Sequence, residues 1–220
     1  MALKRDFDQE LQALYQRLLE MGAMAERAVD ASVQSLIELD AAKAKDVIRS
    51  DTQVDILEME IEQRSVHLLS QFKPNPGDLR LLSTITKVVT DLERIADNAE
   101  NIAEITLRLG QHRLARSLVD IPKMAVISIE MLHDALQALI RRDQVLARQV
   151  CKRDDEVDEL YSEVFKTLVS MMQRDKDEDR IAQCANLLFV ARFLERIADH
   201  STNICERVVY LVTGKLERLG

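Results

Sequence analysis

The sequence predicts an all-α protein with six long helices, arranged as two tandem, pseudo-symmetric three-helix bundles. First, only five Gly and three Pro occur, and aromatic residues make up 4 % of the chain. Second, apolar residues recur at helical spacing between the few breaks. Third, two motifs each occur twice, at offsets of 102 and 103 positions. This composition makes an all-β fold a poor explanation of the chain.

Breaks between the helices are marked by Gly, Pro and polar runs. Pro74 to Gly77 forms one break and Gly110 to Pro122 a second, and Gly214 to Gly220 ends the last helix. Three more turns are inferred from charge and weak helix formers, at Leu39–Ala41, Arg141–Asp143 and Gln173–Arg180. The breaks predict helices at about 5–38, 42–72, 78–109, 119–141, 144–173 and 178–213.

The first predicted helix contains a glycine that does not end it. Leu11, Leu14 and Leu18 begin an i, i+3, i+7 pattern that continues beyond Gly22. Gly22 therefore marks either a bend in the helix or a tight contact with another helix.

The internal repeat divides the chain into two corresponding halves. Leu92–Asp97, with the sequence Leu-Glu-Arg-Ile-Ala-Asp, recurs unchanged as Leu194–Asp199, an offset of 102. The acidic motif Asp51–Asp55 corresponds to Asp154–Asp158 at an offset of 103. One insertion or deletion in the intervening loop accounts for the difference. Both motifs fall on the second and third helices of each half, which predicts domains at 1–113 and 114–220.

Each repeated motif places two carboxylates on one helix face, because residues four apart in a helix are neighbours. On a helical wheel, Glu93 and Asp97 lie at the edge of an apolar stripe, so packing of the two helices could gather four carboxylates in each half. Such oxygen clusters suit Mg, Ca, Mn or Fe. The alternative to a metal site is that the carboxylates form a solvated acidic face, or that they form ion pairs with Arg94 and Arg196. The candidate ligands are Asp51, Asp55, Glu93, Asp97, Asp154, Asp158, Glu195 and Asp199.

Charge and cysteine content narrow the range of partners and compartments. A formal net charge of -8 disfavours nucleic acid, whose affinity for proteins comes largely from phosphate contacts. Cys151, Cys184 and Cys205 form no metal-binding or disulfide pattern, which fits a reducing compartment. The chain shows neither the apolar core of a signal peptide nor a membrane-spanning run of about 20 residues. We therefore expect a soluble, cytoplasmic protein without membrane insertion.

Signatures of known enzyme classes are largely missing from the chain. The motifs of phosphate loops, serine hydrolases, zincins and dinucleotide-binding folds do not occur. Glu130 and His133 form one Glu-x-x-His motif, whereas a ferritin-like di-iron site needs two. We therefore expect that the protein is not an enzyme. A carboxylate-bridged di-iron oxidase or metal-storage bundle is the alternative, and a helical scaffold without metal is a third reading.

The chain resembles the PhoU family of phosphate-uptake regulators over essentially its whole length. The resemblance rests on the repeated Leu-Glu-Arg-Ile-Ala-Asp motif followed by Asn-Ile, on Pro76–Arg80 and on Leu19–Gly22. Ala96 and Ala198 stand where many relatives carry Gly, a departure that leaves the carboxylates untouched.

The resemblance implies a function that composition and spacing do not supply. It implies multinuclear metal clusters on the acidic motifs, with iron as the usual ion and Zn, Mn, Mg or Ca as alternatives, and Asn101 and Asn203 as additional ligands. It also implies a non-catalytic negative regulator that links the ATPase subunit of a phosphate ABC transporter to a sensor histidine kinase. Apolar surface on the long helices favours a homodimer.

Overall fold

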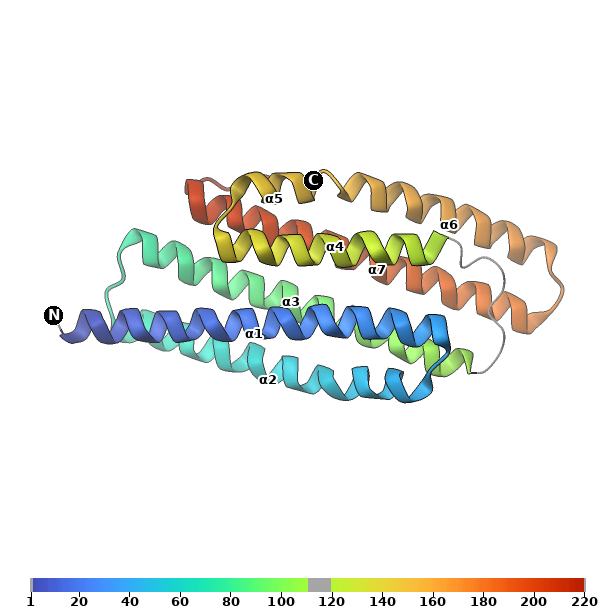
Figure 1. The fold of residues 1–220 in the computed structure, drawn as a ribbon, viewed down its shortest axis with the longest axis horizontal. Helices are drawn as coiled ribbons and strands as arrows, with labels where there is room; N and C mark the ends of the chain where they lie inside the picture. Colours follow the sequence, from blue (N-terminus) through green and yellow to red (C-terminus); the bar gives the residue numbers. More distant parts are fainter. Residues whose placement is uncertain (1, 111–119, 220) are drawn as a thin grey trace.

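The computed structural model describes residues 2–110 and 120–219, and these form an elongated bundle (Figure 1). The predicted domain boundary between residues 113 and 114 lies outside the described residues. The described chain contains no strand, which confirms the all-α prediction, and none of its helices is long and apolar enough to span a membrane. The helices are α1 (Ala2–Glu38), α2 (Ala41–Gln71), α3 (Pro76–Leu109), α4 (Asp120–Arg141), α5 (Gln144–Cys151), α6 (Asp154–Arg174) and α7 (Glu178–Thr213).

The sequence predicts one helix at 144–173, and this prediction is wrong. The structure has two helices there, α5 and α6, with a break between them. The N–H of Arg153 donates to the Val150 carbonyl over a distance of 2.9 Å, a tight turn that ends α5. Three consecutive acidic residues, 154–156, then form the first turn of α6, where the positive end of the helix dipole favours them. The side chain of Arg153 pairs with Glu130 and Asp134 of α4, which fixes the break in place.

The turns repeat along with the helices. Leu39 and Arg142, which correspond at the 103-residue offset, have φ angles of 53° and 51°. In each half the next residue, Asp40 or Asp143, caps the following helix through its side chain. Residues 72–75 separate α2 from α3, whereas residues 175–177 separate α6 from α7. The inferred one-residue insertion therefore lies in the loop between α2 and α3.

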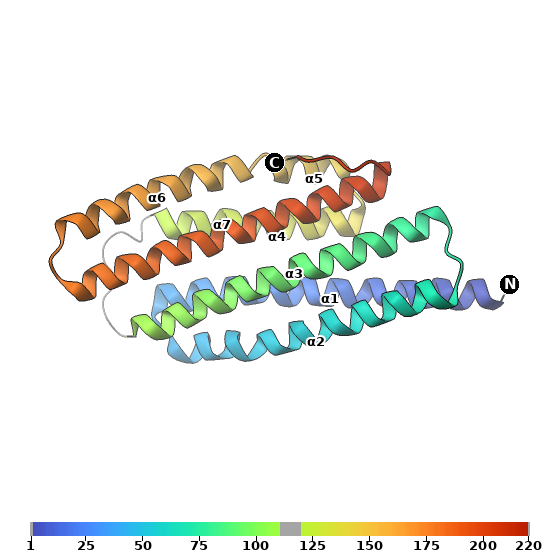
Figure 2. The ribbon, with the colours of Figure 1, turned by 180° about the vertical axis from the view of Figure 1, so that it is seen from behind.

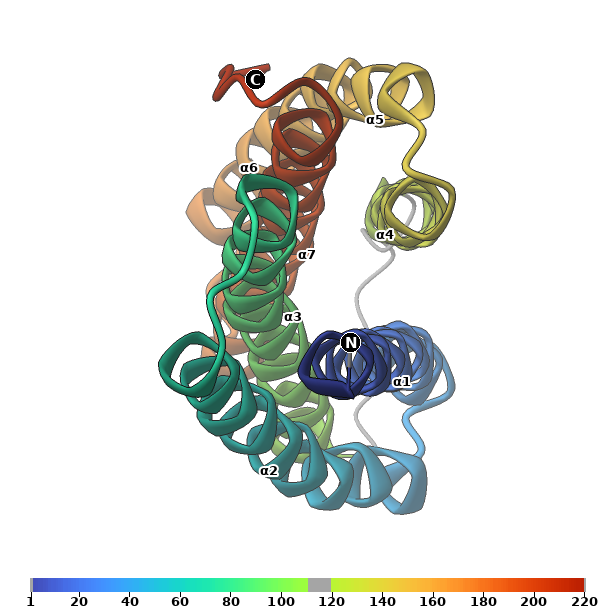
Figure 3. The ribbon, with the colours of Figure 1, turned by 90° about the vertical axis from the view of Figure 1, so that its left-hand side faces the viewer.

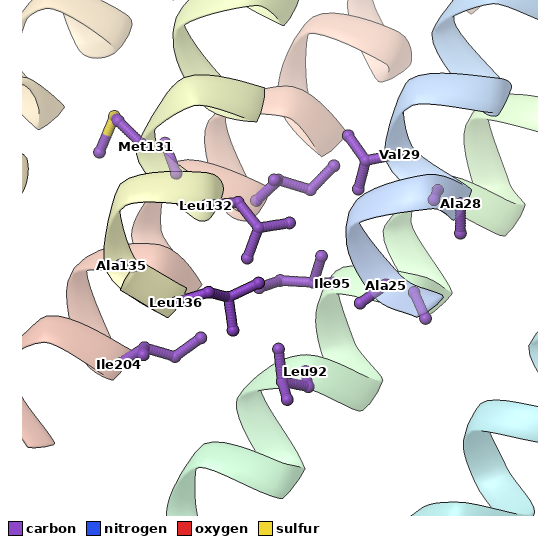
Figure 4. Packing of buried hydrophobic residues seen from close by; sticks show 14 of the residues in the cluster. Ala25, Ala28, Val29, Leu92, Ile95, Met131, Leu132, Ala135, Leu136 and Ile204 are labelled. Atoms are coloured by element: carbon purple, nitrogen blue, oxygen red, sulfur yellow. The ribbon is translucent and has the colours of Figure 1, made fainter. Parts of the chain in front are cut away.

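The central pair of helices, α3 and α7, joins the two halves (Figure 2). Viewed end-on, α1 and α4 lie on the same side of this pair (Figure 3). Side chains from both halves meet in one continuous core, shown by Val29 of α1, Ile95 of α3, Leu132 of α4 and Ile204 of α7 (Figure 4). The repeats are therefore related units that share one core.

Gly22 marks a tight helix contact, one of the two alternatives that the sequence left open. A Cβ atom built at Gly22 would lie 2.7 Å from Cδ2 of Leu136, so α1 and α4 approach closely there. We expect Gly22→Leu to lower the free energy of unfolding by about 1–3 kcal/mol, because the core is overpacked. The measurement is urea denaturation followed by circular dichroism.

Gly22→Ala is the matched control for this contact. A single methyl group needs only a small shift of the Leu136 side chain, and replacing Gly by Ala within a helix gains about 1 kcal/mol of helix propensity. The alanine variant should therefore be close to the parent in stability. A leucine variant as stable as the parent would show that α1 and α4 separate without cost.

Candidate functional site

The first acidic motif lies where α2 and α3 pack together. Val54 and Leu57 of α2 and Leu92 and Ala96 of α3 are buried, so the apolar stripes form the contact that the helical wheel predicted. Alanine in the α3 stripe lets the two backbones approach. The carboxylates at the edges of the stripes are thereby brought to one rim of the helix pair.

Three carboxylates from these two helices converge. One oxygen each from Asp51, Asp55 and Asp97 lies within 4.8 Å of the others, the only such group of three in the described ranges 2–110 and 120–219. Oδ1 of Asp51 is buried and has no hydrogen-bond partner. A buried, unpaired carboxylate oxygen is costly unless a cation binds it, so these residues fit a hard metal ion.

Burial and mutual repulsion raise the pKa values of this cluster. Desolvation is the larger cause and raises the pKa of Asp51 to about 7, with further contributions from the charges of Glu100, Asp55 and Asp97. Glu93 is affected in the same way, chiefly by desolvation and then by Asp97, and its pKa is raised to about 7. A bound cation would reverse both effects by favouring the ionised carboxylates.

Two further glutamates belong to this acidic surface, although the sequence analysis did not select them. Desolvation and neighbouring carboxylates raise the pKa values of Glu58 on α2 and Glu100 on α3. Each lies three residues beyond a motif aspartate, Asp55 or Asp97, and so on the same helix face. That spacing could have revealed them. The internal repeat could not have revealed these two glutamates, because the corresponding residues of the second half are Tyr161 and Thr202.

Glu93 does not join the three aspartates. Arg94 pairs with both motif carboxylates of its helix, at 3.3 Å from Glu93 and 3.1 Å from Asp97. The Asn101 amide donates to the Asp97 carbonyl at 2.7 Å, which leaves its side-chain oxygen as its possible ligand atom. The first site is therefore three convergent aspartates with Glu93 held beside them by an arginine.

The corresponding carboxylates of the second half do not converge as closely. Asp154 opens α6 and is partly buried, whereas Asp158 and Asp199 are exposed. Glu195 is only 8 % exposed, its Oε2 atom is buried without a hydrogen-bond partner, and its Oε1 atom pairs with Arg192. The arginine that neutralises this motif is therefore Arg192, and Arg196 has no ion pair within the described chain.

Burial and neighbouring carboxylates also raise the pKa values of the second motif, where the carboxylates lie less close together. Desolvation, followed by the charges of Asp199 and Asp158, raises the pKa of Asp154 to about 6. The pKa of Glu195 is raised to about 7, again mainly by desolvation, and Arg192 opposes the shift. Partial desolvation and then the charge of Asp158 raise the pKa of Asp199, although much of its side chain reaches water. Both halves thus hold carboxylates that would be stabilised by a cation.

Asp91 connects the two halves near their acidic motifs. Its Oδ1 atom lies 3.0 Å from Nδ1 of His200 and accepts a 3.2 Å hydrogen bond from the Asn203 amide. Asp91 lies on α3 two residues before Glu93, and His200 follows Asp199 on α7. Asn203, a ligand candidate, is therefore engaged with the other half.

Removing this connection should destabilise the pairing of α3 with α7. The side chains of Asp91 and His200 are only 15 % and 18 % exposed, so Asp91→Ala would leave partly buried polar groups unpaired. We expect a loss of about 2 kcal/mol in the free energy of unfolding, measured by chemical denaturation. Asp91→Asn keeps an oxygen acceptor and should lose less. Equal stability of the alanine variant and the parent would contradict a role for Asp91 in joining the halves.

The single Glu-x-x-His motif does not form a site. Glu130 pairs with Arg153, and Nδ1 of His133 lies 2.8 Å from Oε1 of Glu26 on α1. Glu130 is thus engaged with the turn before α6, and His133 with α1. Nothing in this geometry favours a di-iron centre.

Comparison with known proteins agrees with the repeat and the fold. The family model described as the PhoU domain matches residues 18–106 and again 121–208. A phosphate-specific transport system accessory protein PhoU homolog from Clostridium acetobutylicum is 37 % identical over 213 residues, covering 96 % of each chain. A homolog from Aquifex aeolicus is 36 % identical over 207 residues, 94 % of this chain and 93 % of its own length.

Two crystal structures share the fold over nearly the whole chain. PhoU from Pseudomonas aeruginosa aligns with a TM-score of 0.91 and 35 % identity, over 95 % of this chain and 100 % of its own. The phosphate transport system regulatory protein PhoU from Streptococcus pneumoniae aligns with a TM-score of 0.87 and 30 % identity, over 96 % and 99 %. With both halves matched by the family model, this chain belongs to the PhoU family.

Proposed function

We propose that the chain is a metal-binding negative regulator of phosphate uptake, acting as a non-catalytic adaptor in the cytoplasm. It would link the ATPase subunit of a phosphate ABC transporter to a sensor histidine kinase and keep the phosphate-starvation response off when phosphate is plentiful. Relatives named as accessory proteins of phosphate-specific transport support the link to a transporter.

The observation that carries the metal-binding part is the cluster of Asp51, Asp55 and Asp97. Their oxygens converge within 4.8 Å, and one of them is buried without a partner. These side chains would hold the cation, which would neutralise them and draw α2 towards α3. Iron is the ion implied by the family resemblance, and all-oxygen ligation suits Mn, Mg or Ca as well.

The surface of the long helices supports partner binding. Ile56, Met59 and Val66 lie on one side of α2 and are 54 %, 53 % and 65 % exposed. Exposed apolar side chains at helical spacing are suited to pack against a partner helix or a second copy of the chain. We therefore expect protein partners, including a homodimer, and no nucleic-acid partner because the net charge is -8.

A genetic test addresses the regulatory role directly. Deleting the gene should make a phosphate-repressed reporter active in high phosphate, and the parent gene supplied in trans should restore repression. The double variant Asp51→Asn/Asp97→Asn tests whether metal binding is needed for repression, with Glu62→Gln, exposed on the same helix α2, as the control. Continued repression in the deletion strain would overturn the proposed function.

A biochemical test addresses the metal. Protein purified without chelators or affinity tags should contain metal by elemental analysis, and the double variant should contain much less. If both proteins contain metal only at the background level, the acidic motifs are a solvated surface and not a metal site.

A further inference from the structure

A polar hollow of about 600 Å³ lies beside the second acidic motif. Arg196 and Arg207 of α7 and Arg218 of the C-terminal tail line it together with carboxylates that include Asp154 and Asp199. In the described chain, none of these arginines has a carboxylate oxygen within the 4.0 Å of an ion pair. The hollow that these arginines line is large enough for a small anion with ordered water.

Other arginines of the described chain also lack a carboxylate partner, Arg174 among them, but Arg196, Arg207 and Arg218 line one space together. Arg17 and Arg153, for comparison, each pair with two carboxylates. A guanidinium group presents several N–H donors in a planar fork that matches the oxygens of a phosphate or carboxylate. Three such groups around one hollow are therefore suited to an oxyanion from solution.

The C-terminal tail is anchored so that Arg218 reaches the hollow. α7 ends at Gly214, whose φ angle of 73° turns the chain back, and the tail then runs beside α5 (Figure 2). Glu217 pairs with Arg148 of α5 at 2.7 Å. On the other side of Arg218, the Leu219 N–H donates to Oε1 of Glu206 at 2.8 Å. Both neighbours of Arg218 are thus held, which fixes its position.

Charge in the hollow is balanced without a cation. Three arginines and three carboxylates line it, the carboxylates being those of Asp154, Asp199 and Glu206. A divalent cation bound by Asp154 and Asp199 would leave an excess of positive charge. A doubly charged oxyanion would then gain both the cation and the guanidinium groups as partners.

The first half does not repeat this arrangement. At the 102-residue offset, Arg207 corresponds to Ile105, and Thr202 of the hollow corresponds to Glu100. Arg94, the counterpart of Arg196, is already paired with Asp97. The first site therefore has more carboxylates than arginines beside it, whereas the second has as many arginines as carboxylates.

We propose that the hollow beside the second acidic motif binds a tetrahedral oxyanion of the phosphate class, and that a cation on Asp154 and Asp199 raises its affinity. The second statement rests on the metal-binding function proposed above. Linkage then requires the oxyanion to raise the affinity for the cation by the same factor.

Equilibrium dialysis of the full-length protein with labelled inorganic phosphate tests this, once with Mg²⁺ and once with a chelator. We expect one saturable site with Mg²⁺ and weaker binding with the chelator. Arg207→Gln and Arg218→Gln should each weaken phosphate binding by about tenfold or more, because each removes a charge-assisted contact. Arg174→Gln, an exposed arginine with no ion pair in the described chain, should change nothing. Sulfate should compete with phosphate.

Each outcome separates this site from the metal-binding function. Phosphate binding that is absent under both conditions, or unchanged in both arginine variants, would overturn the oxyanion site. Arginine-dependent phosphate binding in a protein that takes up no cation would support the oxyanion site and contradict the proposed metal function. Neither arginine is buried, and an unfolding midpoint equal to that of the parent confirms that a weakened variant is folded.

Discussion

Replacing Asp51 by Asn should raise the melting temperature of the metal-free protein at pH 8 and abolish its stabilisation by metal. The carboxylate of Asp51 is crowded by Asp55 and Asp97 and has a buried, unpaired oxygen, so its ionised form destabilises the fold. Because the side chain keeps partial contact with water, we expect a gain on the order of 1 kcal/mol, equivalent to about 2–4 °C. Differential scanning calorimetry with and without metal measures both effects.

The pH dependence of this gain follows from the raised pKa of Asp51, about 7 in the folded protein against an ordinary value of 3.8. Below the ordinary value the carboxyl is protonated in both states, and the full stability is present. As the pH rises towards 7, the unfolded chain ionises first, so the metal-free protein loses stability. The advantage of Asp51→Asn over the parent should therefore be small near pH 4 and largest above pH 7.

Metal reverses the order of the two proteins. Cation at about 100 times its dissociation constant stabilises the parent by about 2.7 kcal/mol and should leave the variant almost unchanged. Glu62→Gln, an exposed change on the same helix, is the control and should behave as the parent. A lower melting temperature of metal-free Asp51→Asn at pH 8 would mean that the carboxylate stabilises the fold by itself.

The sequence predicted most helix boundaries because the breaks carry strong local signals. Asn75 caps α3 ahead of Pro76, and Asp40 and Asp143 cap the helices that follow the two inferred turns. The break between α5 and α6 lacks such a signal, since Arg153 at its N-cap position makes no side-chain capping bond. Its ion pairs with α4 are long-range contacts that local patterns do not report.

The residues of the candidate site could be predicted from the sequence, whereas their arrangement in space could be predicted only in part. Helical spacing placed Asp51, Asp55 and Asp97 on the correct rims, because that placement depends only on periodicity and on the apolar stripe. The inequality of the halves depends on side chains that the repeat does not share. In the second half Arg192 forms an ion pair with Glu195. The residue that corresponds to Arg192 in the first half, at the 102-residue offset, is Thr90.

This inequality predicts that the two acidic motifs bind metal with different affinity. Asp97→Asn should weaken the tightest Mn²⁺ site at least about tenfold, because it removes one of three convergent ligands. Asp199→Asn, the corresponding change in the second half, should leave that site almost unaffected, since Asp199 is exposed and belongs to no comparable group in the described chain. Calorimetric titration of both variants and the parent measures the affinities.

The cause of the difference is the charge around each motif. Glu58 and Glu100 add negative charge beside the first site, which attracts a cation, whereas Arg196 and Arg207 beside the second site repel it. Adding phosphate should then narrow the difference by strengthening the second site alone. Equal losses of affinity in the Asp97→Asn and Asp199→Asn variants would mean that the sites become equivalent once metal is bound, and that the asymmetry belongs to the metal-free protein.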